Sequence, residues 1–213
     1  MIFLNFKIYQ ETSGDNTLKL CRLIRRLADQ RVIPCLQAVD IYRVKAVLPD
    51  LEVWGQHADP VGYGKFTGCQ APISLMMNGA GGVLLNHAEH QLSLETIKAT
   101  VALCRESKIR VMIITDTLEL IQKINPLKPD YIGFEDPQLI GGPIAMIDAH
   151  FDLIKQAAVG AKAPLIVGGG IRTTNHVRKS LLAGGKGVLV ASEFAKSADP
   201  GQTLQELILG LDH

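Results

Sequence analysis

The stretch that decides the fold runs from residue 164 to residue 192 and reads PLIVGGGIRTTNHVRKSLLAGGKGVLVAS. Two short apolar runs, 164–167 and 187–190, stand on either side of a segment with helical spacing, 174–183. The apolar runs are continuous rather than alternating, as in parallel strands that are buried on both faces. The stretch therefore predicts a strand, a helix and a second strand parallel to the first, the unit from which α/β folds are built.

The same alternation extends over the whole chain. Apolar runs typical of strands lie at 2–6, 32–37, 51–55, 82–86, 109–114, 131–134, 164–167 and 187–190. Segments with helical spacing lie at 16–30, 41–48, 70–79, 93–107, 117–124, 144–160, 174–183 and 202–211. Eight strands at an even spacing of about 26 residues favour a single (β/α)8 barrel in one domain, residues 1–213. A doubly wound open sheet is the structural alternative, although it normally uses fewer strands.

Composition excludes several classes of protein. Of the 213 residues 47% are hydrophobic and 20% are charged, and the formal net charge is +1, which excludes intrinsic disorder. No basic excess or basic cluster indicates a nucleic-acid partner. The N-terminal residues 1–7 lack the basic start and the long apolar run of a signal peptide, and polar residues interrupt the uncharged stretch 66–88. We therefore expect a soluble protein with no nucleic acid and no membrane as partner.

The four cysteines, Cys21, Cys35, Cys69 and Cys104, are widely scattered and form no Cys-x-x-Cys pair. This pattern fits neither a disulfide scaffold nor a zinc knot. We expect buried free thiols and a cytoplasmic location, where the surroundings are reducing.

Polar residues follow several of the predicted strands at the end where barrels carry their chemistry. Asn5 and Lys7 end the first strand, His87 follows the fourth and Glu135 follows the sixth. Each residue has an ordinary structural explanation when it is taken alone. A lysine, a histidine and a glutamate that converge on one rim instead indicate a catalytic site, because a buried carboxylate without a function is costly.

Glycines mark a predicted phosphate site. Residues 168–170 are Gly-Gly-Gly, and the threonines at 173–174 suit the N-cap of a helix. Glycine allows the backbone to approach a ligand closely, and the free N–H groups at a helix start favour an anion. Together with Ala-Ser at 191–192, the run forms the phosphate site that barrels commonly build from their last two loops. Ile-Gly-Gly-Pro at 140–143 suits a mobile lid.

Six segments resemble, in order and at compatible spacing, the triosephosphate isomerase family, especially its short archaeal form. They are Asn5-Phe6-Lys7; residues 56–59 with 63–68; Leu85-Asn86-His87-Ala88-Glu89; Phe134-Glu135 with 140–142; 168–171; and 187–192.

The resemblance implies a single TIM barrel that interconverts dihydroxyacetone phosphate and D-glyceraldehyde 3-phosphate through an enediolate. It makes Glu135 the catalytic base, His87 a neutral electrophile and Lys7 the cation that stabilises negative charge. The substrate-binding residues that it implies are Asn5, Lys7, Ile140, Gly141, Gly170, Ala191 and Ser192. It implies a small phosphorylated triose as substrate and neither a metal nor an organic cofactor.

Two further expectations come from the resemblance. Asp136 follows Glu135 where the family usually has proline. We expect this second carboxylate either to raise the pKa of Glu135 or to compete for the substrate's surroundings, and Pro137 to hold Asp136 extended. The loop around Thr67-Gly68 resembles one that members of the family insert into a neighbouring subunit. A homodimer or a homotetramer is therefore expected.

Other functions remain open at this point. A metal-dependent barrel hydrolase would use His57, His87, His90 and Glu135, but the first strand ends in a lysine where such enzymes have ligands. An isomerase of another phosphosugar, and a phosphosugar-binding barrel with weakened catalysis, also fit the pattern.

Overall fold

Eight parallel strands form one closed barrel in the computed structural model, which describes residues 1–212. The strands are β1 (Ile2–Asn5), β2 (Val32–Leu36), β3 (Trp54–Gly55), β4 (Gly82–Leu85), β5 (Arg110–Thr115), β6 (Tyr131–Phe134), β7 (Leu165–Val167) and β8 (Gly187–Val190). Each strand pairs with the next, and pairing of β1 with β8 closes the ring. The predicted (β/α)8 barrel is confirmed, and the alternative prediction of a doubly wound open sheet is wrong. His213, the last residue of the predicted domain, lies outside the described residues.

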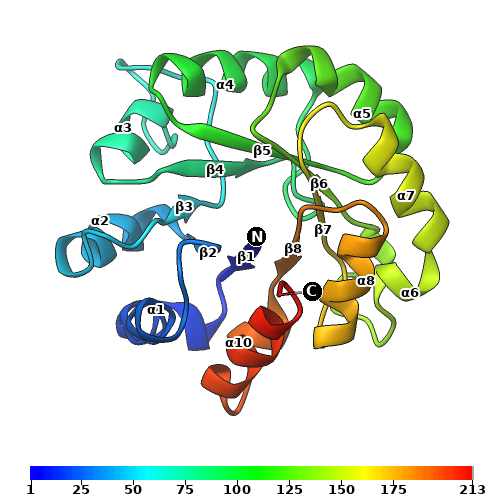
Figure 1. Ribbon diagram of the computed structural model, residues 1–213. Coiled ribbons are helices and arrows are strands. Elements are labelled where there is room, and N and C mark those ends of the chain that lie inside the picture. Colours follow the sequence, from blue (N-terminus) through cyan, green and yellow to red (C-terminus); the bar gives the residue numbers. More distant parts are fainter. Residues whose placement is uncertain (213) are drawn as a thin grey trace.

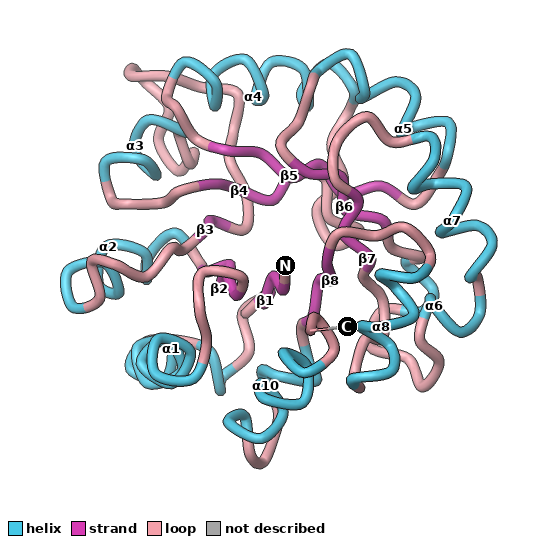
Figure 2. The backbone as a smooth tube through the Cα atoms, in the orientation of Figure 1, coloured by secondary structure: helices cyan, strands magenta, loops and turns pink. Residues whose placement is uncertain are grey.

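Helices surround the barrel on its outer side (Figures 1 and 2). They are α1 (Asp15–Leu27), α2 (Ala38–Val47), α3 (Pro72–Met77), α4 (Leu94–Glu106), α5 (Leu118–Ile124), α6 (Met146–Ala149), α7 (Phe151–Gly160), α8 (Thr174–Leu182), α9 (Ser192–Ala195) and α10 (Pro200–Leu209). In α1 the side chains of Cys21 and Ile24 are buried whereas those of Arg22, Arg25 and Arg26 are exposed, which is the amphipathic pattern that packs a helix on a barrel. Among the described helices, none has the length and apolarity that crossing a membrane requires.

Two predicted elements differ from the observed ones. The strand expected at 51–55 is reduced to the two residues of β3, because the N–H of Leu51 bonds back to the carbonyl of Leu48 in the turn after α2. The helix expected at 144–160 is divided into α6 and α7 at His150, whose φ of −134° and ψ of 39° are not helical.

The cysteines differ from expectation at one position. All four are free thiols, and Cys21, Cys35 and Cys104 are buried as predicted. Cys69 is exposed, because it lies in the long loop between β3 and α3, where residues 63–69 all face solvent.

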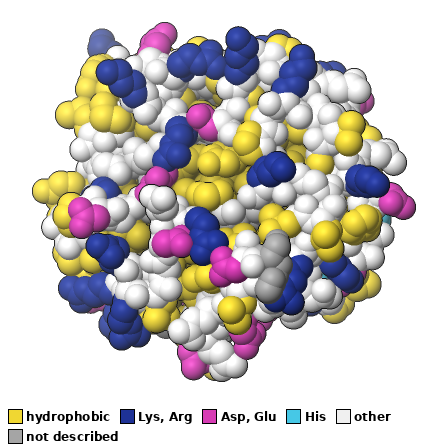
Figure 3. All heavy atoms as spheres, in the orientation of Figure 1, with side chains coloured by type: hydrophobic (Ala, Val, Ile, Leu, Met, Phe, Trp, Pro, Cys, Tyr) yellow, Lys and Arg dark blue, Asp and Glu magenta, His cyan; other side chains and the backbone are white. Residues whose placement is uncertain are grey.

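Large side chains fill the inside of the barrel. The indole of Trp54 lies at its centre, with the ring of Phe3 edge-on at 5.0 Å and the ring of Tyr131 at 5.8 Å. Gly82 makes room for this indole, since a Cβ atom there would lie 2.3 Å from the Trp54 ring. Figure 3 shows hydrophobic side chains gathered in the middle of one face within a ring of charged ones. The barrel is therefore a packed core, which fixes the positions of the strand ends.

We expect Gly82→Ala to lower the free energy of unfolding by about 1–3 kcal/mol, because the added methyl group overpacks the barrel against Trp54. Urea unfolding followed by the fluorescence of Trp54, the only tryptophan, measures the change. Gly62→Ala is the matched control, since a Cβ atom there meets nothing within 4 Å. Equal losses in the two variants would contradict the packing described here.

Candidate active site

All nine residues predicted for the site line one pocket of about 490 Å³, a volume that includes its open mouth. They are Asn5, Lys7, His87, Glu135, Ile140, Gly141, Gly170, Ala191 and Ser192. They come from the ends of β1, β4, β6, β7 and β8 and from the segment that follows β6. The closed ring of strands thus gathers at one rim the side chains that the sequence scatters over almost 190 positions.

Glu135 is a buried carboxyl group at the end of β6. Its side chain is 6% exposed, and its Oε2 has no hydrogen-bond partner among the described residues. Burial raises the pKa of Glu135 to about 7, although Lys7 and the backbone N–H of Gly169 both favour the charged form. A carboxyl group with this pKa can take up and release a proton near neutral pH, which is what a general base must do.

Asp136, the residue after Glu135, turns its carboxylate toward the residues that follow it. Asp136 accepts the N–H of Gln138 at 2.9 Å and lies 3.4 Å from Nε2 of His150. It thereby caps the 3-10 turn η3 (Pro137–Leu139), and its φ of −87° and ψ of 117° are extended, as expected before proline. The pKa of Glu135 is raised as predicted, but burial is the main cause and Asp136 is not among the groups that shift it.

His87 faces Glu135 across the pocket, with its Nε2 3.5 Å from Oε2 of Glu135. Its other ring nitrogen, Nδ1, accepts the backbone N–H of Glu89 at 3.1 Å. An accepting Nδ1 carries no proton, so the proton of the neutral ring is on Nε2 and points into the pocket. Burial, and then the charge of Lys7, lower the pKa of His87. His87 is therefore suited to donate a hydrogen bond as a neutral imidazole.

Lys7 is a cation that is only 9% exposed. Its Nζ lies 2.6 Å from Oε1 of Glu89, which is itself 58% exposed. The backbone of Lys7 has a left-handed φ of 46° and is held by hydrogen bonds on both sides. Its N–H donates to Oδ1 of Asn5 at 3.0 Å and its carbonyl accepts from Nε2 of Gln56 at 3.0 Å. This turn directs the ammonium group toward the pocket instead of solvent.

The far end of the pocket is lined by backbone. Gly141, Gly169 and Gly170 have φ values of 70°, 86° and 72°, which side chains rarely adopt. A Cβ atom at Gly170 would also lie 2.7 Å from the carbonyl of Ile144, so the glycine turn can pack closely beside the lid. Glycines in these conformations allow the backbone to approach a ligand closely, as the predicted phosphate site requires.

The structure adds lining residues that the sequence did not single out, chiefly Tyr9, Arg172 and Glu193. Arg172 stands in the stretch 164–192 that predicts the fold, and a cation shortly after a glycine turn was the signal that could have identified it. Tyr9 and Glu193 carried no recognisable signal, because only the fold brings them to the pocket.

The residues of the hydrolase alternative do not form a metal centre. The rings of His57 and His90 stack at 4.2 Å, and Nε2 of His57 lies 3.2 Å from Oδ1 of Asp59. Within residues 1–212 no three or more His, Cys, Asp or Glu side chains are grouped so that they could hold a metal ion. The geometry gives this alternative no support.

The closed barrel, the glycine-lined end of the pocket and the pair formed by a buried carboxyl group and a neutral histidine define the class of (β/α)8-barrel isomerases. Sequence comparison narrows the class. A family model described as "Triosephosphate isomerase" matches residues 1–208, and the chain belongs to the triosephosphate isomerase family.

Individual relatives agree with the family model. The triosephosphate isomerase of Methanosarcina acetivorans is 33% identical over 215 residues, which are 97% of this chain and 96% of that protein. That of Thermoplasma volcanium is 33% identical over 210 residues, 97% of this chain and 98% of the relative. The crystal structure of triosephosphate isomerase from Bartonella henselae superposes with a TM-score of 0.79 at 20% identity, covering 97% and 98% of the two chains, and shows the shared fold.

The raised pKa of Glu135 gives stability a pH dependence. Below the ordinary pKa of 4.5, Glu135 is protonated in both the folded and the unfolded protein, and its contribution to the free energy of unfolding is fully present. This contribution is lost as the pH rises toward about 7, because the unfolded protein then releases the proton while the folded protein still holds it. We expect the free energy of unfolding of the wild type to fall by roughly 2–3 kcal/mol between pH 5 and pH 8 from this group. Glu135→Gln should remove that fall, as measured by urea unfolding at both pH values.

The exposed residue Glu106 supplies a control, because Glu106→Gln should leave the pH dependence of the wild type in place. An equal dependence in wild type and Glu135→Gln would contradict the burial of a titrating carboxyl group.

Proposed function

We propose that this chain catalyses the interconversion of dihydroxyacetone phosphate and D-glyceraldehyde 3-phosphate, with Glu135 as base, His87 as electrophile and Lys7 as the stabilising cation. The observation that carries the proposal is Oε2 of Glu135, which has no hydrogen-bond partner within residues 1–212. It lies 3.5 Å from Nε2 of His87 in a pocket with a glycine-lined end. A carboxylate oxygen that no described residue occupies is free to take a proton from a substrate bound in the pocket beside both side chains.

The reaction needs a proton moved between two adjacent carbons. Oε2 of Glu135 removes the proton from one carbon, and the electrons of that C–H bond move toward the carbonyl oxygen. The N–H of His87 donates a hydrogen bond to this oxygen as negative charge develops on it, and the Lys7 ammonium group adds a nearby positive charge. The proton of the neighbouring hydroxyl group passes through His87 to this oxygen, so that the old carbonyl oxygen becomes a hydroxyl group and the old hydroxyl oxygen becomes the new carbonyl oxygen. The protonated Glu135 then returns its proton to the carbon that carried the first carbonyl group. Burial strengthens each of these electrostatic contributions.

The phosphate would lie at the glycine-lined end. The backbone at Ile140, Gly141, Gly170, Ala191 and Ser192 would hold it there, and Asn5 would help to place the three-carbon chain. A fixed phosphate determines which carbon faces Glu135, so it serves as the handle that orients the substrate.

Removing the base should abolish most of the activity. We expect Glu135→Gln to lower kcat/KM for D-glyceraldehyde 3-phosphate by roughly 10²–10⁴-fold, the usual contribution of a general base. Because the base must be ionised, kcat/KM of the wild type should also fall as the pH drops below about 7. A coupled spectrophotometric assay across this pH range measures both effects.

Folding of the variant is checked by its urea unfolding curve, and competition by longer sugar phosphates tests the substrate. A wild type that turns over triose phosphates no faster than Glu135→Gln would overturn the catalytic role. A preference for a longer sugar phosphate would overturn the proposal that the substrate is a triose phosphate.

We also infer that the chain, as one domain over residues 1–213, acts in the cytoplasm as a homodimer or a homotetramer. Exposed apolar side chains support the assembly: Ile8 and Val39 line a second hollow beside Lys7, and Val39 is 82% exposed. Tyr63 and Phe66 are exposed on the loop that follows β3. Seating this loop in the hollow of a second copy would cover both apolar groups.

A charge in the hollow should prevent that contact. We expect Val39→Asp to shift the protein toward a monomer in sedimentation velocity, because association would bury an unpaired carboxylate. Leu182→Asp, a matched change on the outer face of α8, should leave the assembly intact. A wild type that sediments as a monomer at micromolar concentration would overturn this part of the proposal.

A further inference from the structure

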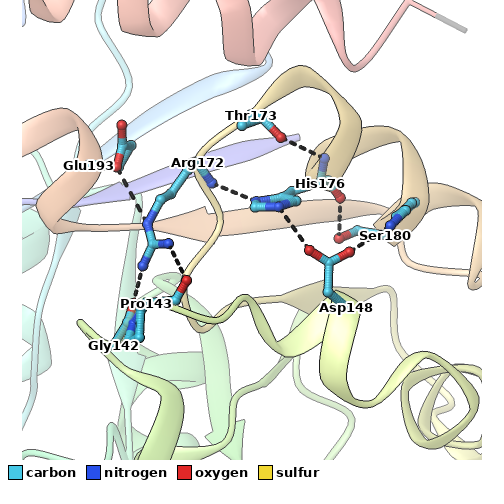
Figure 4. Close-up of polar contacts among 9 residues, drawn as sticks. Gly142, Pro143, Asp148, Arg172, Thr173, His176, Ser180 and Glu193 are labelled. Carbon is cyan, nitrogen blue, oxygen red and sulfur yellow. Dashed lines mark hydrogen bonds and ion pairs between the residues drawn. The ribbon is translucent and has the colours of Figure 1, made fainter.

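Three segments surround the phosphate end of the pocket, and one side chain connects them. The segments are the lid, residues 140–143; the glycine turn, residues 168–170; and the turn from β8 into α9, residues 190–193. Arg172 lies two residues after the glycine turn, and its guanidinium group contacts the other two segments (Figure 4). Its Nη1 donates to the carbonyl of Pro143 at 2.8 Å and its Nη2 donates to the carbonyl of Gly142.

The third nitrogen of the guanidinium group reaches the remaining segment. Nε of Arg172 lies 3.7 Å from Oε2 of Glu193, which lines the same pocket. A carboxylate at this place would repel a bound phosphate dianion unless a cation neutralised it. Arg172 supplies that cation and uses separate nitrogens for the lid and for Glu193.

The backbone of Arg172 is held from a second direction. Its N–H donates to Nδ1 of His176 at 3.1 Å, and Nε2 of His176 lies 3.1 Å from Oδ2 of Asp148 (Figure 4). Asp148 belongs to α6, the helix into which the lid leads, and its Oδ1 is 2.6 Å from Nζ of Lys179. Arg172 is thus tied to the lid by its side chain and to the helix behind the lid by its main chain.

We propose that Arg172 is a positioning residue that fastens the lid to both phosphate-holding turns. This inference rests on the proposed function. The planar guanidinium fork is what allows one residue to serve two carbonyls and a carboxylate; a lysine ammonium group in the same place keeps the charge but not this geometry. Loss of the fastening leaves the lid loose over the enediolate.

A loose lid has a chemical consequence. In the enediolate, the bond between C3 and the phosphate ester oxygen can break; its electron pair leaves with inorganic phosphate while the electrons of the enediolate form a new carbon–carbon double bond. The resulting enol tautomerises to a three-carbon 2-oxoaldehyde, so the step needs no oxidant and no co-reactant. A lid held over the phosphate opposes this loss by keeping the leaving group in place and water out.

The test compares Arg172→Met and Arg172→Lys with the wild type and with Arg26→Met, which changes an exposed arginine on α1. Three kinds of measurement are made: steady-state kinetics (kcat and KM) with D-glyceraldehyde 3-phosphate, inorganic phosphate released per isomerisation, and hydrogen exchange of the peptide 138–144, which contains the lid. We expect both Arg172 variants to release at least tenfold more phosphate per turnover and to exchange the lid faster. We also expect kcat/KM to fall by about 10–100-fold. Arg26→Met should match the wild type.

The outcomes separate this inference from the proposed function. Unchanged phosphate release and lid exchange in Arg172→Met would overturn the inference, and so would wild-type behaviour of Arg172→Lys, because charge alone would then suffice. Exchange of the β-strand peptides at the wild-type rate shows that a variant is folded. A wild type without isomerase activity would overturn the proposed function, while lid exchange would still decide whether Arg172 fastens the lid.

Discussion

The burial of the Glu135 carboxyl group is the constraint on which the rest of the site depends. Taking a carboxylate out of water costs several kcal/mol, and neither the charge of Lys7 nor the N–H of Gly169 offsets this cost, because the pKa still rises to about 7. The close approach that buries the group requires a glycine at 168, where a Cβ atom would lie 2.1 Å from Oε1 of Glu135. The glycine run for which we propose a phosphate-binding role therefore also makes space for the carboxyl group of Glu135. Any side chain at position 168 would therefore displace the carboxyl group of Glu135.

A rigid rim holds this unfavourable arrangement in place. Lys7 and Asn86 follow β1 and β4 in left-handed conformations, which cost of order 1–3 kcal/mol each for residues with a side chain. Hydrogen bonds compensate locally: Asn86 donates to the carbonyl of Ile114 and accepts the N–H of Leu92, both at 2.8 Å. The packed interior around Trp54 prevents the strand ends from relaxing. Strain at two strand ends is thus the means by which the lysine and the neighbouring histidine are directed into the pocket.

Much of this could be predicted from the sequence, for identifiable reasons. Strands buried on both faces are continuous apolar runs, so eight of them were recognisable, and rim residues follow from strand ends. The prediction was wrong where a local hydrogen bond interrupts the pattern, as at Leu51, and where helical spacing continues across a break, as at His150. The cause of the raised pKa of Glu135 was also misjudged, since sequence adjacency places Asp136 beside the base while the backbone turns its carboxylate away. Contacts such as that between Arg172 and Gly142 join residues 30 positions apart and leave no local signal.

The break at His150 bears on Asp136, which stands before the lid where the resemblance to the family would place proline. Nε2 of His150, the residue that ends α6, lies 3.4 Å from Oδ2 of Asp136, while Oδ1 of Asp136 caps the turn η3 that leads to the lid. Asp148, two residues earlier in the chain, reaches the other end of the lid through His176 and the main chain of Arg172. The segment 148–150 therefore contacts Asp136 on one side of the lid, and on the other side His176, which accepts the N–H of Arg172. Through these contacts α6 and the residue that ends it connect Asp136, the neighbour of Glu135, with Arg172, the residue that we propose fastens the lid.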